Sequence, residues 1–555
     1  MNAKEKAPLD PAASSDSNWF DREIGWLRAN HRWLCWAILL ALLLDLIAVA
    51  ALSCGPINVF HNDALLLLDD GWRVLNGQVP HRDFYTPLGP VEFLLVAGGM
   101  KLSHGSAQGI AIGIAALGLA LGLWAWLLSR SRMPPLFASL VTAWTVLTAT
   151  CPTPLGFDPR YLSCAMIYNR QGYALLGIIL VECAFARERN RFWGGFSSGL
   201  ALALLVFLKL NFFGVAALML LVTLPLSRAE LSRVWGLCAG AATPTLAFLV
   251  YPRFSFAAFF ADMSFVARAR GSSLNIAGLS HGAALCVRSG SFWLVIAMAV
   301  GVVILSTPRQ RSQGKILTLA LLTFIVLASG PLFLQTNSLE NRCQLASLWI
   351  IVLLDPVSEL HLRLKAGKIA TLALTAACLG GVAAALVPDV SSTLNLLSYN
   401  ASSQKASGIL IPAPGMEKMR FYDSTPFYDK VKFGDGDGTY YAETLNDGIN
   451  LLNSKTRPDE TILVLGFHNP FSYLLRRKPA AGGSSYLFVG NSMSADHMLP
   501  GNSVFDHADL MMLPENEGTH RVSDQFIQTY YRDDLLRNFD FVANSDYWKL
   551  YRRKR

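Results

Sequence analysis

Charged residues are scarce in this chain of 555 residues. They make up 15% of the sequence, whereas hydrophobic residues make up 52% and the mean hydropathy is +0.36. This composition excludes an ordinary soluble enzyme and indicates a polytopic membrane protein. No basic groove interleaved with aromatic residues is present, so the net charge of +8 does not indicate a nucleic-acid partner. We interpret that charge through the positive-inside rule instead.

Metal-binding cysteine patterns are also missing. The nine cysteines include no CxxC pair and no Cys/His spacing typical of zinc, so we predict no metal site built from them. Cys151 and Cys164 fall in one predicted outer loop and could pair, but we expect both to be unpaired. No cysteine follows Cys378, so the C-terminal part of the chain must be held together by its core alone.

Long apolar runs dominate the part of the chain before residue 389. They lie near 33–54, 107–128, 135–150, 172–187, 194–209, 211–226, 234–251, 291–306, 316–334, 343–355 and 369–388. The first run is too long for a signal-peptide core, so we interpret it as a retained span. The turn at Lys209 splits 194–226 into two short spans, and 88–103 is expected to be re-entrant or interfacial. We therefore predict about eleven transmembrane helices, several of them shorter than a perpendicular crossing needs.

Basic residues are concentrated in alternate segments between these runs. This bias predicts that residues 1–32 are cytoplasmic and that 33–388 form the transmembrane domain. The predicted outer loops are 55–106, 151–171, 252–290 and 335–342. An odd number of spans places 389–555 outside as well, which corresponds to the periplasmic side of a bacterial inner membrane.

The sequence changes character after residue 388, where the long apolar runs stop. LNDGINLLNSKTRPDE (445–460) has leucine and isoleucine at helical spacing and ends at Arg457-Pro458, which predicts an amphipathic helix. TILVLGF (461–467) and FDFVANS (540–546) are typical of strands. We therefore predict a small extracytoplasmic α/β domain over 389–555.

The most informative stretch is HNDALLLLDDGWRVLNGQVPHRDFYTPLGP (61–90), which follows the first span and contains four aspartates. If 62–77 is a helix, Asp63 and Asp70 share one face, two turns apart. Asp69 and Arg73 are spaced for an ion pair worth tenths of a kcal/mol. Gly77 is suited to end the helix. The alternative is a solvated amphipathic helix with ordinary surface carboxylates.

Three prolines then predict a rigid, extended turn. They are Pro80, Pro87 and Pro90. The turn would present Asp83, Tyr85 and Glu92 next to the acidic helix, forming a shallow acidic cup at the outer face. Asp63 lies closest to the end of the first span, so we expect burial there to raise its pKa.

This arrangement resembles the GT-C superfamily of integral-membrane glycosyltransferases, in particular bacterial relatives of the protein O-mannosyltransferase and aminoarabinose-transferase families. Those enzymes usually open this helix with an Asp-Glu pair about 14–15 residues before a glycine; here Asn62-Asp63 stands in that place, with Gly77 at the matching distance. One carboxylate of the pair is therefore missing, and the general base is either Asp63 or Asp83. As architecture the resemblance covers roughly residues 30–390, and as a motif it covers 62–90.

The resemblance and the predicted topology suggest roles for further residues. Lys209 is a charge within an apolar sequence, which either snorkels to the surface or faces a polar cavity. Arg342 resembles a lipid-phosphate clamp, although Cys343 replaces the tyrosine that usually follows. Tyr168, Asn169 and Arg170 are sugar or phosphate contacts, or else an interfacial aromatic and arginine belt. The complete set is: catalytic Asp63 and Asp83; donor phosphate Lys209, Arg268, Arg270 and Arg342; substrate Asn62, Asp70, Tyr85, Glu92, Tyr168, Asn169, Arg170 and Glu340.

The resemblance implies an inverting transfer of a sugar from a polyprenyl-phosphate donor to a hydroxyl of a glycan, lipid or protein acceptor. Such a reaction needs a carboxylate to take the acceptor proton and fixed cations for the released phosphate. A glycosidase would instead need two opposed carboxylates. No metal site is predicted; the acidic helix could hold Mg²⁺ or Mn²⁺, but this transfer does not require either.

Two other functions are open at this stage. A transporter or flippase of a lipid-linked saccharide should show broken helices at matching positions in two halves, and only 194–226 suggests one. An O-antigen ligase or polymerase would use arginine and histidine in a large outer loop. The 252–290 segment, with four arginines and His281, leaves this alternative open.

Overall fold

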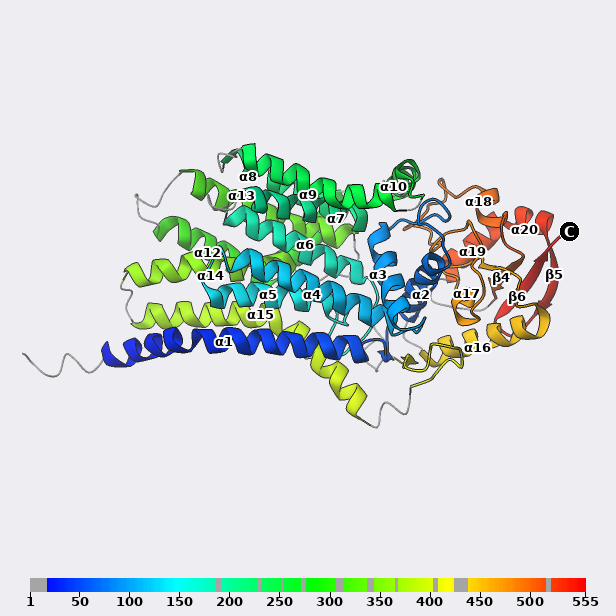
Figure 1. Cartoon of the computed structure of the whole chain (residues 1–555), viewed down its shortest axis with the longest axis horizontal. Helices are drawn as coiled ribbons and strands as arrows, with labels where there is room; N and C mark the ends of the chain where they lie inside the picture. Colours follow the sequence, from blue (N-terminus) through cyan, green and yellow to red (C-terminus); the bar gives the residue numbers. More distant parts are fainter. Residues whose placement is uncertain are drawn as a thin grey trace, which may run out of the picture.

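The protein is a long helical bundle that carries an α/β region at one end (Figure 1). The computed structural model describes residues 17–185, 191–226, 231–251, 253–270, 276–305, 313–336, 344–364, 368–402, 408–423, 438–515 and 521–555. The bundle contains α1 (Ser17–Leu52), α4 (Gly109–Ser129), α5 (Pro135–Thr150), α6 (Ile167–Ala184), α7 (Arg191–Leu208), α8 (Leu210–Leu226), α9 (Leu231–Val250), α12 (Gly290–Leu305), α13 (Gln313–Thr336), α14 (Gln344–Leu364) and α15 (Lys368–Ala401). Each predicted apolar run therefore coincides with a helix.

Five helices are long and apolar enough to cross a membrane among the described residues, and six if the bent pair α11–α12 forms one span. The five are Arg32–Leu52 of α1, α4, α7, α9 and Ile316–Leu334 of α13. Shorter apolar helices lie at Pro135–Thr150, Leu210–Pro225 and Gln344–Leu354. The chain is thus an integral membrane protein by composition, whereas the number of crossings and their orientation stay predictions.

Large apolar side chains cover the outside of the bundle, where lipid replaces water as the solvent. Trp33, Trp36 and Leu221 are 69–77% exposed in the protein alone. Inside, α7 and α9 pack backbone against backbone through glycines. A Cβ at Gly199 would lie 2.0 Å from the carbonyl oxygen of Leu237, and one at Gly240 would lie 2.0 Å from that of Phe196. Small residues at this spacing are a common means of helix packing in membranes.

The predicted outer loop 252–290 is largely helical. It contains α10 (Phe256–Arg270) and α11 (Ile276–Val287). Helix α11 meets α12 at a bend of 74°. Apolar residues such as Phe259 and Met263 become buried on one face of α10, which explains why this segment is ordered as a helix rather than as an open loop.

The C-terminal region contains both strands and helices. A mixed sheet has the order β3-β4-β6-β5, formed by β3 (Ile462–Val464), β4 (Leu510–Pro514), β6 (Trp548–Arg553) and β5 (Phe539–Asn544). Strands β3 and β4 are parallel, with Ile462 opposite Leu510, and the other pairs are antiparallel. The helices are α16 (Gly438–Lys455), α17 (Phe471–Leu474), α18 (Gly501–Phe505), α19 (Arg521–Tyr530) and α20 (Arg532–Asn538).

Two predicted strands and one predicted helix lie where the sequence placed them. Residues 461–467 contain β3 and 540–546 overlap β5. Helix α16 covers the amphipathic stretch and buries Leu445, Ile449 and Leu452. The boundary predicted at 388 falls inside α15, because the helix continues through Pro388 to Ala401.

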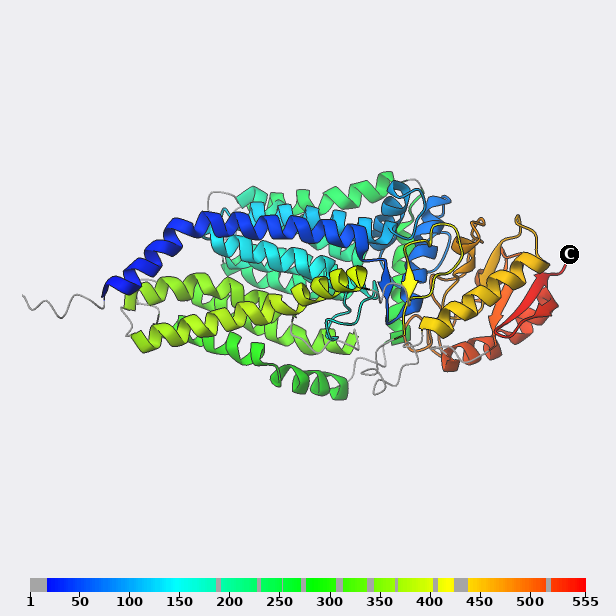
Figure 2. The same ribbon diagram turned by 90° about the horizontal axis from the view of Figure 1, so that it is seen from below.

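The region between bundle and sheet is built from the acidic stretch. Helices α2 (His61–Leu75) and α3 (Pro90–Leu102) lie at the end of the bundle against the C-terminal region, in both views (Figures 1 and 2). Strand β1 (Pro56–Ile57) pairs in parallel with β2 (Arg420–Phe421). One hydrophobic core includes Leu65 of α2, Ile110 of α4, Leu452 of α16 and Leu550 of β6. The two parts of the chain are therefore packed as one body.

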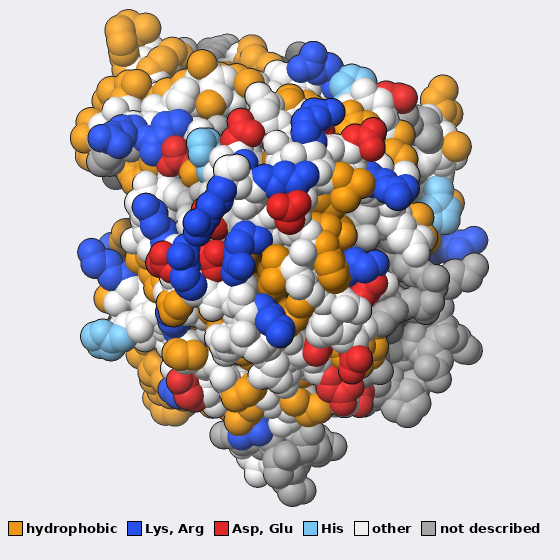
Figure 3. Space-filling model, turned by 90° about the vertical axis from the view of Figure 1, so that its right-hand side faces the viewer, with side chains coloured by type: hydrophobic (Ala, Val, Ile, Leu, Met, Phe, Trp, Pro, Cys, Tyr) orange, Lys and Arg blue, Asp and Glu red, His pale blue; other side chains and the backbone are white. Residues whose placement is uncertain are grey.

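The end of the C-terminal region that faces away from the bundle is charged. Figure 3 shows Lys and Arg side chains interspersed with Asp and Glu on this face. Ion pairs there include Arg552 with Glu460 (2.8 Å) and Arg457 with Asp459 (3.4 Å). Such a surface is suited to water, which agrees with a region that lies outside the lipid.

Candidate active site

Helix α2 presents the acidic residues. It begins after Phe60, whose φ of 50° turns the chain, and ends before Gly77, whose φ of +85° favours glycine. Asp63 lies in the first turn and is half-buried, whereas Asp70, two turns later, is fully buried. The N-terminal turn of a helix is a favourable position for a negatively charged side chain.

Asp69 and Arg73 form the predicted ion pair, but they form it in the interior. The Nε atom of Arg73 donates to Asp69 Oδ2 at 2.9 Å, and the two side chains are 0% and 1% exposed. Arg73 Nη1 also donates to the carbonyl oxygens of Ala480 (3.3 Å) and Gly482 (3.2 Å). The expected surface pair worth tenths of a kcal/mol is therefore wrong, because the C-terminal region covers this face of α2.

Asp70 lies beside this pair, and among the described residues neither of its carboxyl oxygens accepts a hydrogen bond. Burial raises the pKa of Asp70 well above its ordinary value, the nearby Asp69 raises it further, and Arg73 lowers it only in part. The interior therefore favours the protonated form of Asp70 more than water does.

Asp83 is held by its own neighbours. Arg82 donates through Nε to Asp83 Oδ1 at 2.7 Å and through Nη2 to Oδ2, and the backbone N–H of Val79 donates to Oδ2 at 2.7 Å. Partial burial raises the pKa of Asp83, but these hydrogen bonds lower it below its ordinary value overall. A carboxylate with a lowered pKa is a weak base, so this environment is less favourable for general-base catalysis than that of Asp63.

Glu92 is buried in the first turn of α3 and faces Gln171 of α6. It is 1% exposed, and no partner reaches hydrogen-bond geometry with either carboxyl oxygen among the described residues. Burial raises the pKa of Glu92 to about 7, and the nearby Gln171 amide lowers it slightly. Of the acidic cup that the sequence predicts, Asp70 and Glu92 are buried, whereas Asp63 and Asp83 are half-buried.

Lys209 occupies the break between α7 and α8, as predicted. Its Nζ atom donates to Asn169 Oδ1 at 2.6 Å and lies 4.9 Å from the centre of the Tyr168 ring. Because the helix is interrupted here, the carbonyl oxygen of Leu208 accepts a hydrogen bond from the N–H of Gly89, at 3.1 Å. The fold therefore brings Lys209 to the Pro-rich turn and to the start of α6.

The two arginines of α10 have different surroundings. Arg268 is exposed. Arg270 is half-buried, and its Nε donates to the backbone oxygen of Asn491 at 2.8 Å. Its positive charge also lowers the pKa of Tyr486, which burial and the negative charges of Asp63 and Asp70 raise to about 12 overall. Arg270, Asp63 and Asp70 therefore all act electrostatically on Tyr486.

Arg170 does not face this cluster. Its Nη1 contacts Asp389 Oδ1 of α15 at 3.2 Å, and its Nε donates to the carbonyl oxygen of Thr153 at 2.7 Å. Both members of the ion pair are buried. These contacts hold the start of α6 against α15, and the role of Arg170 as a sugar or phosphate contact stays a prediction.

The side chain of Tyr85 makes its contacts within the protein. Its hydroxyl donates to the backbone oxygen of Ser492 at 2.6 Å, and its ring packs on Phe265 at 5.2 Å. Asn62 is buried next to Asp63. Glu340 and Arg342 lie outside the described residues. No group of three or more His, Cys, Asp or Glu residues suited to a metal ion occurs in the described part of the chain.

Sequence reasoning missed the contribution of the C-terminal region. Tyr486 packs with Leu66 of α2, Leu88 and Phe93, and Tyr168 packs against the same cluster. Nothing in the local sequence of 484–493 shows this position, since it depends on contacts with residues about 400 positions earlier. Cys151 and Cys164 are both free, as expected.

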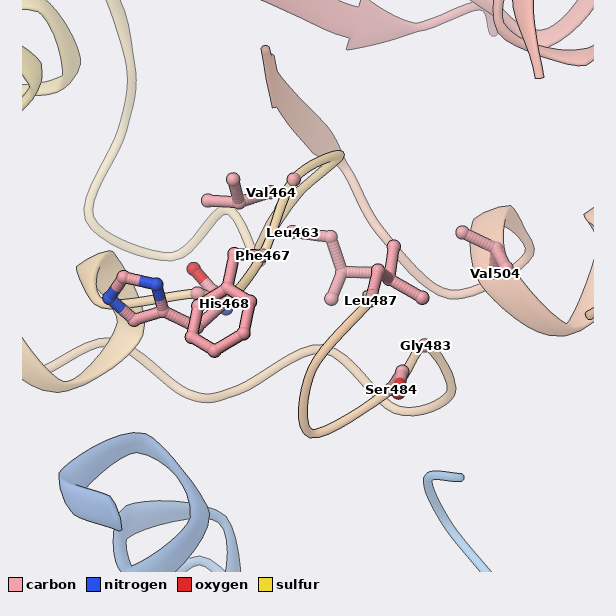
Figure 4. A pocket seen from close by; sticks show the side chains of 10 residues that line it. Leu463, Val464, Phe467, His468, Gly483, Ser484, Leu487 and Val504 are labelled. Carbon is pink, nitrogen blue, oxygen red and sulfur yellow. The ribbon is translucent and has the colours of Figure 1, made fainter. Parts of the chain in front are cut away.

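A small recess lies beside this cluster in the C-terminal region (Figure 4). Its lining follows the end of β3 and includes Phe467, His468 and Ser484, which Figure 4 labels. His468 Nε2 is 2.9 Å from the hydroxyl of Tyr441. The recess has room for about one water molecule, so it does not accommodate a sugar ring.

Comparison with solved structures found similar chains, among them two structures of ArnT. No protein-family model matches the chain, and no curated protein matches it. ArnT from Cupriavidus metallidurans in the apo state has a TM-score of 0.40 at 13% identity, over 94% of this chain and 98% of that one. ArnT bound to undecaprenyl phosphate has a TM-score of 0.44 at 14% identity, over 93% and 97%. At these TM-scores the likeness does not determine the substrate or the mechanism of this chain.

Proposed function

We propose that this chain is an inverting glycosyltransferase that moves a sugar from a polyprenyl-phosphate donor to an acceptor hydroxyl at the outer face of a membrane. The observation that carries the proposal is the pair of tyrosines Tyr168 and Tyr486, which pack in one cluster. Lys209 Nζ lies 4.9 Å from the Tyr168 ring, and Asp63 and Arg270 both act electrostatically on Tyr486. One carboxylate and two cations, at the end of an apolar bundle, are the groups that this reaction needs. The residues 62–90 that resemble the GT-C superfamily supply the carboxylate.

Asp63 is the proposed general base. Its carboxylate takes the proton of the acceptor hydroxyl while the hydroxyl oxygen forms a bond to the anomeric carbon. The bond between that carbon and the phosphate oxygen breaks, and its electron pair leaves with the phosphate. Attack opposite to the leaving phosphate inverts the configuration at the sugar carbon. Asp83 is the weaker candidate because Arg82 and the Val79 N–H already bind its carboxylate.

Lys209 and Arg270 are the proposed phosphate ligands. Lys209 is fixed by Asn169, and Arg270 is fixed by the backbone of Asn491, so both cations are positioned before the phosphate arrives. Positioned charges stabilise the departing anion without reorganisation cost. Asp70 and Glu92, buried close by, are the proposed contacts to sugar hydroxyls, together with Asn62. The transfer needs no metal ion because the phosphate is a good leaving group.

Sugar transfer by the purified protein in lipid, from a panel of labelled polyprenyl-phosphate sugars, tests this function. Asp63→Asn should reduce the rate by about 10²–10⁴-fold, the usual contribution of a general base. Asp83→Asn is the matched control and should retain most of the activity. If instead Asp83→Asn is inactive and Asp63→Asn is active, the base is Asp83. A folded wild type that consumes no donor contradicts the proposal.

One observation favours a transporter or flippase as the second candidate. The bundle contains two interrupted helices, one at Lys209 between α7 and α8 and one at the 74° bend between α11 and α12. Broken helices of this kind line substrate paths in transporters. Movement of a labelled lipid-linked saccharide between leaflets, without sugar transfer, would support this candidate against the enzyme.

A further inference from the structure

The C-terminal region sends one short segment into the candidate site. Residues 484–493, which we name the 484–493 loop, follow the recess of Figure 4 and lie against α2, α6 and α10 through Tyr486 and Asn491. The loop is folded on itself: Ser492 Oγ donates to the carbonyl oxygen of Tyr486 at 3.0 Å and accepts from the N–H of Phe488 at 2.9 Å. These internal hydrogen bonds hold the two ends of the loop together.

Gly490 gives this loop its shape. Its φ is +88°, a conformation that only glycine adopts without strain, and its N–H donates to the carbonyl oxygen of Met493 at 2.7 Å. A Cβ at this position would meet no atom within 4 Å. An alanine at this position would therefore strain the backbone conformation without a steric clash with neighbouring atoms.

The loop is attached to the first outer loop by Tyr85. The Tyr85 hydroxyl donates to the Ser492 oxygen at 2.6 Å, and the Ser485 N–H donates to the Tyr85 oxygen at 2.9 Å. The same first outer loop also holds α10, since His81 Nδ1 and Asp262 Oδ2 are 2.9 Å apart. Helix α10 and the 484–493 loop thus share one anchor, and they meet where Arg270 binds Asn491.

We propose that the 484–493 loop is a positioning element that places the guanidinium of Arg270 for the lipid phosphate. This inference rests on the proposed function, because that function assigns Arg270 to the phosphate. The backbone oxygen of Asn491 accepts a hydrogen bond from Arg270 Nε at 2.8 Å, and this contact fixes the orientation of the planar guanidinium group. Arg268 lies on the same helix and is exposed, whereas Arg270, which contacts the loop, is half-buried.

Equilibrium binding of a polyprenyl monophosphate to the full-length protein in detergent tests the proposal. Gly490→Ala should weaken binding about tenfold, as expected for a non-glycine residue forced into this conformation. Gly301→Ala is the matched control, since its Cβ also meets no atom within 4 Å but its φ is not positive, and it should leave binding unchanged. In an Arg270→Ala background, Gly490→Ala should weaken binding little further, because both changes remove the same interaction.

Tyr85→Phe is the second variant, in case Gly490→Ala does not fold. It removes the hydroxyl that anchors Ser492 and keeps the packed ring, and it should weaken binding in wild type but not with Arg270→Ala. Tyr530→Phe, on an exposed ring of α19, is its control. If the losses multiply in the double variants, the loop does not act through Arg270 and the proposal fails. A wild type that binds the phosphate lipid, shows this coupling and yet transfers no sugar would contradict only the proposed function.

Discussion

At the scale of single residues, the buried carboxyl groups distinguish this site from an ordinary acidic surface. Glu92 has an ordinary pKa of 4.5 and a pKa of about 7 in the folded protein. Between these values the unfolded chain loses its proton while the folded chain keeps it. Protonated Glu92 therefore makes its full contribution to the stability of the folded protein below about pH 4.5. This contribution is lost as the pH rises through about 7.

Glu92→Gln should accordingly make the protein more stable at pH 8 and leave it unchanged at pH 4. The expected gain is on the order of 3 kcal/mol, the free energy of a shift of about 2.5 pKa units. Thermal unfolding of the two proteins across this pH range measures it. Glu443→Gln, on an exposed glutamate of α16, is the control and should change neither midpoint. A gain that is equal at both pH values would contradict a buried, titrating Glu92.

Some of these residues could be predicted from the sequence, and others could not. The 3.6-residue period places Asp63 and Asp70 on one face of α2, and Lys209 is visible as a charge in an apolar run. The ion pair of Arg170 with Asp389 of α15 could not be predicted, since the helical period does not show which distant residue lies opposite it. The depth of Asp69 and Arg73 was also missed, because residues 480–482 cover them from a distant part of the chain.

At the scale of elements, the turn before α3 fixes the break between α7 and α8. A Cβ at Gly89 would lie 1.9 Å from the carbonyl oxygen of Phe207, so no other residue fits there without moving the helix end. Gly89→Ala should displace Lys209, costing at least the 1–3 kcal/mol typical of overpacking and most of the transfer activity. Residual activity and unfolding temperature measure the two effects.

The same helix offers a matched control for this change. A Cβ at Gly98 of α3 would meet no atom within 4 Å, so Gly98→Ala should be neutral, or stabilising by roughly 0.5–1 kcal/mol as glycine is replaced inside a helix. An active, stable Gly89→Ala protein would show that the α7–α8 break tolerates movement. The helices themselves were predictable because apolar length alone identifies them, but this contact joins two of them across the fold and has no local signal.

At the scale of the whole molecule, the C-terminal region is fastened to the end of the bundle. The short β1–β2 pairing, the shared core and the hydrogen bond from Trp72 Nε1 to the Arg477 oxygen (2.8 Å) all cross between the two parts. The sequence predicted two regions of different composition. It could not predict that they share one core, because the strand pairing and the Trp72 hydrogen bond join residues more than 350 positions apart.

Arg73 is the residue on which this attachment depends most, since its guanidinium binds Asp69 and the backbone of residues 480 and 482 from a fully buried position. Arg73→Met should destabilise the protein by about 3–5 kcal/mol, because it leaves the Asp69 carboxylate buried without its partner. Limited proteolysis should then release the C-terminal region faster than from wild type. Asp69→Asn combined with Arg73→Met should recover part of the loss, since no buried charge is left unpaired. If the double variant is no more stable than Arg73→Met, the cost comes from the lost contacts to Ala480 and Gly482, and the arginine acts as a bridge between the two regions rather than as a partner of Asp69.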